Sequence, residues 1–360
     1  MCGPPYGDVG YGDVTAVELP CRRFPSPTVV GDPLSAPALT RPLAPPRPAD
    51  PDAGLPPNAL GKNKGALEQI TLYVFVLVPF LALAAVVPAA WGWGLSWLDV
   101  VLGVGFYFVT LLGVTVGYHR HFTHGSFKAT RPLRVAMAAV GGMAIQGPVV
   151  QWVADHRRHH AFSDRAGDPH SPWRYGTGPR ALLKGMFHAH IGWLFDRRQT
   201  NAARYAPDLI KDVAIRRTSR LFVVFAFLSL ALPAVVGGLV TGSWAGAWSA
   251  FFWAGLVRVA LLHHVTWSIN SVCHVMGNRP FMSRDRATNF WPLAILSAGE
   301  SWHNLHHADP TCARHGVLRG QIDMSARVIW AFEKLGWANS VKWPDPVRLA
   351  AKRRPIEAAA

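Results

Sequence analysis

The chain has 360 residues, of which 50% are hydrophobic and only 16% are charged, and its 36 Lys and Arg against 21 Asp and Glu give a net charge of +15. A soluble domain usually carries roughly 25% charged residues. A chain that is both apolar and basic is therefore unusual for a soluble enzyme and typical of a membrane protein whose cytoplasmic loops carry the positive charge. The four Cys form no Cys-x-x-Cys pair, which disfavours a disulfide scaffold and a thiolate zinc site.

The two ends of the chain differ in composition from its middle. The first sixty residues hold 14 of the 29 Pro and show no apolar periodicity. Such a stretch cannot bury enough surface to offset the entropy lost on ordering it. The sequence therefore predicts a disordered tail over residues 1–66, one membrane domain over residues 67–330 and a C-terminal tail over residues 331–360.

Four hydrophobic runs in the middle of the chain are long enough to cross a bilayer, which takes about 20 residues of helix. A weaker stretch at residues 133–153 contains Gly, Gln and Pro, and we expect an interfacial or protein-buried helix there. The predicted spans are residues 70–90, 97–118, 219–240 and 244–269.

Basic residues predict the orientation of these spans. The connectors 89–96 and 241–243 contain no Lys or Arg, whereas residues 119–218 contain sixteen and the region after His274 contains twelve. Because cytoplasmic loops are enriched in Lys and Arg, we expect both termini, residues 119–218 and residues 274–330 to be cytoplasmic. The predicted fold is an all-α, multi-pass membrane protein with four transmembrane helices in two hairpins and a helical cytoplasmic cap.

Histidine is the other excess, with 16 residues, and three clusters lie in the predicted cap or at a helix end entering it. Two of them share the spacing His-x-x-His-His, which places imidazoles on one face of a helix. In the first cluster, His119 and His124 diverge by roughly 140° on an ideal α-helix, so this pair works best where the helix ends or bends. Imidazole suits Fe, Zn, Cu and Ni. This many ligands exceeds the needs of one ion and predicts a site for two metals.

The sequence resembles the membrane-bound fatty acyl desaturases, the stearoyl-CoA desaturase-like group, from about residue 67 to about residue 316. The shared motifs are Gly-Tyr-His119-Arg-x-x-x-His124, Trp152-x-x-Asp155-His156-Arg-x-His159-His160, Asp168-Pro-His170, Trp267-x-x-Asn270 and Gly299-Glu300-x-x-His303-Asn-x-His306-His307.

The resemblance implies a di-iron centre that uses O₂ and is held by nine His, with a water on an Asn. Asn270 would hold that water. Asn270 and His274 are also one helical turn apart at the cytoplasmic end of the fourth span, so both can face one cavity. The implied ligands are His119, His124, His156, His159, His160, His274, His303, His306 and His307.

The resemblance also implies residues for substrate binding. Arg197 and Arg198 match a basic pair that contacts the phosphates of coenzyme A in relatives, and Arg is suited to bidentate phosphate binding. The alternative is a pair facing solvent or lipid headgroups. Ala154 stands where vertebrate relatives carry a further Arg that contacts coenzyme A. Trp152, Asp155 and Trp267 of the shared motifs are further candidates for the substrate site.

Gly103 and Tyr107 lie one turn apart on the second span, three to four turns from His119. In relatives, residues at this level close the acyl tunnel, so we expect Tyr107 to limit chain length. Arg258 is the one Lys or Arg deep in a predicted span, and we expect it to face the bundle interior with a partner. Four further His have open roles, although His121 is not expected to be a ligand: His121, His263, His264 and His315.

The predicted function is an O₂-dependent desaturase that inserts a cis double bond, at the delta-9 position, into a saturated long-chain acyl-CoA in a membrane lipid environment. The sequence has no cytochrome b5 His-Pro-Gly-Gly motif and no Gly-x-Gly-x-x-Gly motif. We therefore expect an external electron donor, such as a ferredoxin, a flavin reductase or a cytochrome b5-like protein. The basic cap would dock an acidic partner of this kind.

Three other functions compete with this prediction. The nearest is an acyl-lipid desaturase or a fatty acid hydroxylase with the same histidine motifs. A membrane metal transporter would need ionisable residues along the spans, and only Arg258, His263 and His264 fit. Nucleic-acid binding is not expected, because the positive charge follows the pattern of membrane topology.

Overall fold

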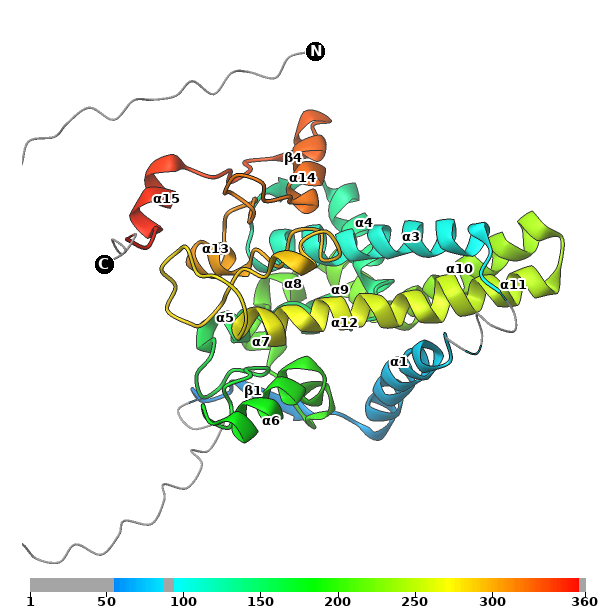
Figure 1. The fold of residues 1–360 in the computed structure, drawn as a ribbon, viewed down its shortest axis with the longest axis horizontal. Coiled ribbons are helices and arrows are strands. Elements are labelled where there is room, and N and C mark those ends of the chain that lie inside the picture. Colours follow the sequence, from blue (N-terminus) through cyan, green and yellow to red (C-terminus); the bar gives the residue numbers. More distant parts are fainter. Residues whose placement is uncertain (1–54, 87, 89–93, 356–360) are drawn as a thin grey trace, which may run out of the picture. The chain divides into compact units, whose positions relative to one another are not determined.

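The computed structural model describes residues 55–86, 88 and 94–355 (Figure 1). Contacts divide the chain into two units, Met1–Pro46 and Arg47–Ala360, and every described residue belongs to the second. Of the tail predicted over residues 1–66, residues 1–54 lie outside the described part. Residues 60–63 of that predicted tail form strand β1 (Leu60–Asn63).

Four helices are long and apolar enough to cross a membrane, which confirms the predicted all-α membrane fold. They lie within a few residues of the predicted spans. The first is α1 (Ala66–Ala84), and the second is α3 (Trp97–Leu112) continued by the π-helix η1 (Gly113–Thr123). The third is α10 (Phe222–Thr241), and the fourth runs through α11 (Trp244–Ala250), π-helix η3 (Phe251–Val257), α12 (Arg258–Ser271) and η4 (Val272–His274).

The fourth span is the centre of this bundle. Segments η3 and α12 pack against both α1 and α3, and η3 also packs against α10. In Figure 1, α12 lies between α3 and α1. Half of its most apolar window is buried (50%), against 17% for α1 and 22% for α10. The outer spans therefore present apolar side chains outward, as lipid-facing helices do.

Polar residues define where the spans begin and turn. Ser96 caps α3 by accepting the amide of Asp99, and the Asp99 carboxylate accepts the Ser96 amide in return. The same carboxylate accepts a hydrogen bond from Ser249 Oγ at 2.8 Å, which ties α3 to α11. Gly242 ends α10 with φ +62°, and Ser243 then caps α11. The Asp99–Ser249 contact therefore connects the second and fourth spans near their first turns.

Arg258 has the buried partners that the sequence left open. Its Nη2 donates to the carbonyl and the hydroxyl of Ser229, at 2.8 and 2.9 Å, and its Nε donates to the Ala254 carbonyl at 3.0 Å. Ser229 lies on α10, so the guanidinium links the third span to the fourth. Backbone and hydroxyl oxygens thus satisfy Nε and Nη2 of this buried cation, whereas Nη1 has no hydrogen-bond partner among the described residues.

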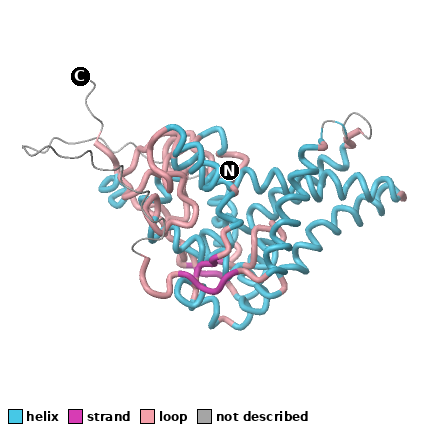
Figure 2. The backbone as a smooth tube through the Cα atoms, turned by 90° about the horizontal axis from the view of Figure 1, so that it is seen from below, coloured by secondary structure: helices cyan, strands magenta, loops and turns pink. Residues whose placement is uncertain are grey.

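The cap consists of short helices and two small antiparallel sheets (Figure 2). Strand β1 pairs with β3 (Arg198–Thr200), and β2 (Lys128–Ala129) pairs with β4 (Ala338–Asn339). The weaker stretch 133–153 falls in two helices, α4 and α5, separated by a turn. The remaining elements are α4 (Arg131–Gly142), α5 (Val149–Phe162), α6 (Pro179–His190), η2 (Gly192–Phe195), α7 (Ala202–Tyr205), α8 (Pro207–Lys211), α9 (Val213–Arg220), η5 (Trp291–Leu293), α13 (His303–Ala308), α14 (Met324–Lys334) and α15 (Pro346–Lys352).

The C-terminal segment differs from the tail predicted over residues 331–360. Within its described part, α14 continues to Lys334, β4 pairs with β2, and α15 follows. Ala338 is buried, because β4 closes over the turn that follows the second span. Strand β4 has only two residues and its partner strand lies more than 200 residues earlier, so local pattern alone gives no sign of this pairing.

Candidate metal centre

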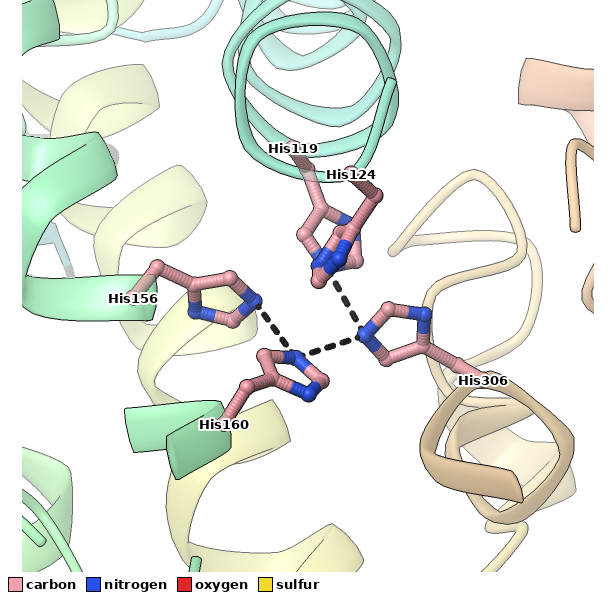
Figure 3. Close-up of side chains that lie close together, drawn as sticks. All are labelled: His119, His124, His156, His160 and His306. Carbon is pink, nitrogen blue, oxygen red and sulfur yellow. Dashed lines mark hydrogen bonds between the residues drawn. The ribbon is translucent and has the colours of Figure 1, made fainter. Parts of the chain in front are cut away.

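The nine predicted ligands come together in the cap and divide into two groups. Their ligand atoms lie within 4.8 Å of one another in each group, and each group includes residues from both halves of the chain. The first group, shown in Figure 3, is His119, His124, His156, His160 and His306. The second group is His159, His274, His303 and His307.

Each His-x-x-His-His motif contributes to both groups. On α5, His156 and His160 belong to the first group, whereas His159 points to the second. On α13, the middle residue His306 belongs to the first group and its two neighbours to the second. The sequence predicted convergence on one helix face. In the structure, the histidines of each helix are instead split between the two groups, because α5 and α13 approach the centre from different sides.

The π-helix η1 explains how His119 and His124 can face the same way. A π-helix bonds residue i to residue i+5 instead of i+4. The His124 amide donates to the His119 carbonyl at 3.2 Å, across five residues. The two imidazole centres are consequently 4.9 Å apart. The bend that the sequence required at this point is a widened helical turn.

The donor atoms fit metal ions. In the first group, His306 Nε2 lies 3.1 Å from His119 Nε2 and 2.9 Å from His160 Nε2. In the second group, His303 Nε2 lies 3.1 Å from His274 Nε2 and 3.0 Å from His307 Nε2. Metal–imidazole bonds of about 2.0–2.1 Å place adjacent ligand nitrogens about 3 Å apart.

Two further nitrogens support this assignment. His124 Nε2 and His159 Nε2 are buried and have no hydrogen-bond partner among the described residues. A buried polar atom without a partner is costly, and coordination of a metal would satisfy both atoms. All donors are imidazoles, a set that suits Fe, Zn, Cu and Ni.

Carboxylates hold several of these rings by the nitrogen that faces away from the group. Such a contact fixes the imidazole tautomer and leaves Nε2 free to bind metal. Among the described residues, three of the four rings in the second group have such a partner, against one of five in the first. The pairs are His159 Nδ1 to Asp168 at 3.0 Å, His274 Nδ1 to Asp164 at 2.8 Å, His307 Nδ1 to Asp285 at 2.6 Å and His119 Nδ1 to Glu300 at 2.5 Å.

Sequence reasoning missed these four acids as functional residues. Asp168 and Glu300 stand inside motifs that the resemblance singled out, but no role was assigned to them. The sequence offered one weak indication for Asp164 and Asp285, because an acid close to a histidine-rich segment is a candidate partner for an imidazole. Their partners, His274 and His307, lie 110 and 22 residues away.

Burial favours the neutral form of three imidazoles of the first group. Desolvation lowers the pKa of His156, His160 and His306 well below the usual value, and neighbouring imidazoles lower it further. Neutral imidazole is the form that binds metal. Burial alone would raise the pKa of Asp168, but the adjacent His159 overrides it and holds that pKa below its usual value. The carboxylate is therefore charged and able to accept from Nδ1.

A buried ionic network continues from Glu300. Arg120 is fully buried and donates through Nε to Glu300 at 3.2 Å and through Nη1 to Asp323 at 3.0 Å. Asp323 also caps α14 by accepting the Ala326 amide. His315 lies 3.3 Å from Arg120 and its ring centre is 4.6 Å from that of His306, so it belongs to the surroundings of the first group.

The other histidines of open role have contacts outside the two groups. His121 Nδ1 lies 3.1 Å from the Phe127 carbonyl, and His263 Nε2 lies 3.0 Å from the Ala144 carbonyl. His264 pairs with His190, Nδ1 to Nε2 at 3.0 Å. His121 therefore contacts the turn that follows η1, whereas His263 and His264 pack the fourth span against Ala144 and His190 of the cap.

A cavity of about 870 Å³ leads to the histidine groups. His119, His156 and His303 line its inner end, and apolar residues of α1 and η1 such as Phe75 and Val114 line its wall. Of the residues proposed from sequence, six also line it: Trp152, Asp155, Arg197, Arg198, Trp267 and Asn270. Five cations that the sequence did not single out line it as well: Lys64, Arg158, Arg174, Arg216 and Arg220.

Gly103 and Tyr107 are not among the residues that line this cavity. Tyr107 is buried against Phe108, and its hydroxyl donates to the Leu296 carbonyl at 2.7 Å. This contact joins the second span to the loop before α13. The role of Tyr107 in chain length stays a prediction, and the cavity lining gives it no support.

The fold, the histidine groups and the cavity define a membrane enzyme of the histidine-motif class, and comparison with known proteins agrees. The fatty acid desaturase family model matches residues 95–317. The chain belongs to the fatty acid desaturase family and is an oxidoreductase of that kind.

The relatives differ in the substrate that their names give. The chain is 39% identical over 289 residues to the hex-5-enoyl-[acyl-carrier protein] acetylenase of Moorena producens (strain JHB), covering 80% of this chain and 90% of the relative. It is 37% identical to the acyl-CoA C20 Delta5-desaturase of Anemone leveillei, covering 72% and 78%. It is 34% identical to the sn-1 stearoyl-lipid 9-desaturase of Anabaena variabilis, covering 79% and 97%.

Proposed function

We propose that this desaturase uses a di-iron centre to insert a cis double bond, at the delta-9 position, into a saturated long-chain acyl-CoA. The observation that carries the proposal is the 870 Å³ cavity, which runs from basic side chains to imidazoles of both histidine groups. An acyl chain in its apolar part would place one methylene pair beside His119, His156 and His303. The headgroup would then lie among the cations.

The reaction balances with an external donor. One O₂, two electrons and two protons combine with the two hydrogens of adjacent methylenes to give one double bond and two waters. Two iron ions, when bound, would supply the oxidising power that no side chain has. Nine His would hold these ions, and Asn270 would hold a water at the second group, which has four His to the first group's five.

The other residues of the site position the substrate and exclude water. Trp152 packs on the His156 ring, with centres 5.0 Å apart, so it limits the space between substrate and ligand. The apolar wall from α1 and η1 removes bulk water from the reacting carbons. A rigid slot of this kind decides which carbon–carbon bond lies beside the metal.

Acyl-CoA is the carrier that we propose, because Arg197 and Arg198 line the cavity together with Arg174 and Arg216. Guanidinium groups bind phosphates in bidentate fashion. Acyl-lipid remains the alternative substrate, and one relative is named for an acyl-carrier-protein thioester. A phospholipid and an acyl-carrier-protein thioester also carry phosphate, and the comparison of the three carriers described below distinguishes them.

We propose that both termini and the active site are cytoplasmic. The support is the distribution of Lys and Arg, which are absent from the short connectors between the spans of each hairpin and abundant in the cap. Cysteine-accessibility labelling from either side of sealed vesicles would test the orientation at exposed cap positions.

The activity is tested by expression in a host that lacks its own desaturase, followed by mass-spectrometric location of double bonds. A new delta-9 monoene is expected from the wild type, and none from His159→Ala. His121→Phe is the matched control and should retain activity, because His121 lies outside both groups. Hydroxylated fatty acids, or lipids unchanged from those of the empty host, would contradict the proposal.

The carrier is tested with purified enzyme in nanodiscs. The same stearoyl chain is offered as the CoA thioester, as the acyl-carrier-protein thioester and within phosphatidylcholine. We expect the highest kcat/KM for the CoA thioester, and we expect Arg197→Gln with Arg198→Gln to raise the KM for that substrate. A higher kcat/KM for either other carrier would overturn the acyl-CoA assignment and leave the desaturase reaction intact.

A further inference from the structure

A second opening reaches the histidine groups from another direction. It encloses about 330 Å³, and three of its lining residues are His124, His160 and His307. The rest of the lining comes from the loop before η5 and from the end of α13, including Met282, Arg284 and Pro310. The large cavity is lined by other members of the groups, namely His119, His156 and His303. The two openings thus contact separate sets of imidazoles.

The small opening is also where the metal ligands come nearest to the surface. Of the nine predicted ligands, His124 and His160 are the two that are partly exposed, and the other seven are buried. Both belong to the first group, and His307 connects the same opening to the second. Any reactant that met the protein here would contact ligand edges of both groups without entering the large cavity.

The C-terminal segment places positive charge beside this opening. Residues 352–354 run alongside residues 280–282: the Met282 amide donates to the Lys352 carbonyl at 2.8 Å, and the Arg354 amide donates to the Pro280 carbonyl at 3.0 Å. Phe281 and Arg353 form an antiparallel bridge between the two segments. We call the three exposed cations at this place the basic rim: Arg284, Arg353 and Arg354.

Among the described residues, the two acids beside the opening, Asp285 and Asp309, already have partners and do not cancel the charge of the basic rim. Asp309 is buried and already pairs with Arg348 and Lys352 of α15. Asp285, which lines the opening, is engaged by His307. The face around the opening is therefore cationic, and it will attract an acidic protein over a range of about 10 Å at 0.1 M salt.

We propose that the small opening and its basic rim form the docking surface for an acidic, one-electron carrier protein. The inference rests on the proposed function, which needs two electrons from outside. Two reduced carriers would dock in succession, and each would give up one electron. The electrons would enter at the edges of His124, His160 and His307 while an acyl chain fills the large cavity. Substrate and electrons thus approach from separate sides.

Binding is measured first, because it does not depend on turnover. The purified protein is immobilised in phosphatidylcholine nanodiscs, and oxidised plant-type ferredoxin, an acidic one-electron carrier, is passed over it in surface plasmon resonance. We expect Arg353→Glu with Arg354→Glu to weaken the Kd about tenfold or more at low salt, by loss of two favourable charges and gain of two unfavourable ones. Raising the salt should remove the difference. Arg353→Gln with Arg354→Gln should give an intermediate loss.

The matched control is Arg180→Glu with Lys211→Glu, which changes the net charge equally on α6 and α8. Both residues are exposed and lie outside the lining of both openings. An equal loss of binding in this control, or unchanged binding in the rim variants, would overturn the docking surface. The paired contacts of residues 352–354 are made by backbone groups, so the rim variants keep them.

A second measurement separates this inference from the proposed function. Holoenzyme is reduced chemically with dithionite and then mixed with O₂ and stearoyl-CoA for a single turnover. Equal monoene yields in the wild type and the rim variants, together with slower turnover of the variants on reduced ferredoxin, support the docking surface. No monoene from any reduced protein would contradict the proposed function itself. Equal rates on reduced ferredoxin would contradict the docking surface alone.

Discussion

The two histidine groups use the same ligand but are supported differently. In the second group, His159, His274 and His307 each have a carboxylate hydrogen-bonded at Nδ1, whereas in the first group only His119 has a carboxylate, Glu300, in close contact with Nδ1 among the described residues. The first group is also the one that includes partly exposed rings. A carboxylate behind an imidazole raises its basicity and fixes its orientation. The second group is therefore built for tight, rigid binding and the first for access.

The largest effect is expected from two single variants, each of which removes one ligand from a different histidine group. His303→Ala and His306→Ala should each abolish desaturation, since each deletes a donor from a different group. Each variant should retain about one of the two metal equivalents, because the remaining group keeps its full set. Elemental analysis of the purified proteins, with His121→Phe as the control, checks the count. Loss of both equivalents in either variant would show that the groups do not bind independently.

A smaller effect is expected when the carboxylates that contact the ligand rings are replaced by amides. Asp285→Asn should weaken metal affinity at the second group by about 10–100-fold, because it removes the acceptor for His307 Nδ1. Glu300→Gln should act in the same way on the first group, through His119. Mössbauer spectra recorded during dialysis against a chelator would follow the two irons separately. Identical loss curves for the two variants would remove the proposed difference between the groups.

The ionic network behind the first group predicts a loss of stability. Asp323→Asn leaves the buried Arg120 with one carboxylate in place of two, and breaking a buried pair costs about 3–5 kcal/mol. A fall in the Tm of the purified protein measures it. Asp208→Asn, which breaks the more exposed pair with Arg157, should cost no more than about 1 kcal/mol. Equal Tm values for the two variants would count against the network.

The smallest effect tests the π-helix that positions the first group. A Cβ on Gly113 would lie 2.4 Å from the Gly141 backbone nitrogen, so Gly113→Ala should push η1 away from α4 and cost about 1–3 kcal/mol. Gly105→Ala is the control, since nothing lies within 4 Å of its Cβ position. A Tm for Gly113→Ala that matches the control would show that the η1–α4 contact is loose.

Most of the fold was predictable because spans depend on local composition. A run of about 20 apolar residues has few alternatives to a membrane helix, and all four runs lie where they were expected. Six of the nine candidate ligands lie in the two His-x-x-His-His motifs, whose geometry is contained within five residues. The complete set, with His119, His124 and His274, was predicted from the resemblance to the desaturases, and the structure brings all nine together. The sequence did not predict the central position of the fourth span, which depends on how whole helices pack.

The part of the site that the sequence did not predict consists of contacts between residues far apart in the chain. The division of His159 from His156 and His160 follows from where α13 and η4 approach α5, and no spacing within one motif contains that information. The acids Asp164 and Asp285 act on histidines that lie 110 and 22 residues away. The pairing of β4 with β2, and of residues 352–354 with residues 280–282, has the same character. Local pattern predicts elements and ligand types, but it does not predict which elements meet.

The distribution of each histidine group over the whole chain has a consequence for biosynthesis. A ribosome that has reached residue 302 has made the first three spans, the fourth span and six of the nine ligands, but neither group has its full set. Strand β1 leaves the ribosome early and waits for β3, and β2 waits for β4, made some 200 residues later. Under the proposed function, iron would therefore be loaded only after translation is nearly complete, and nascent chains stalled before α13 would be released without it.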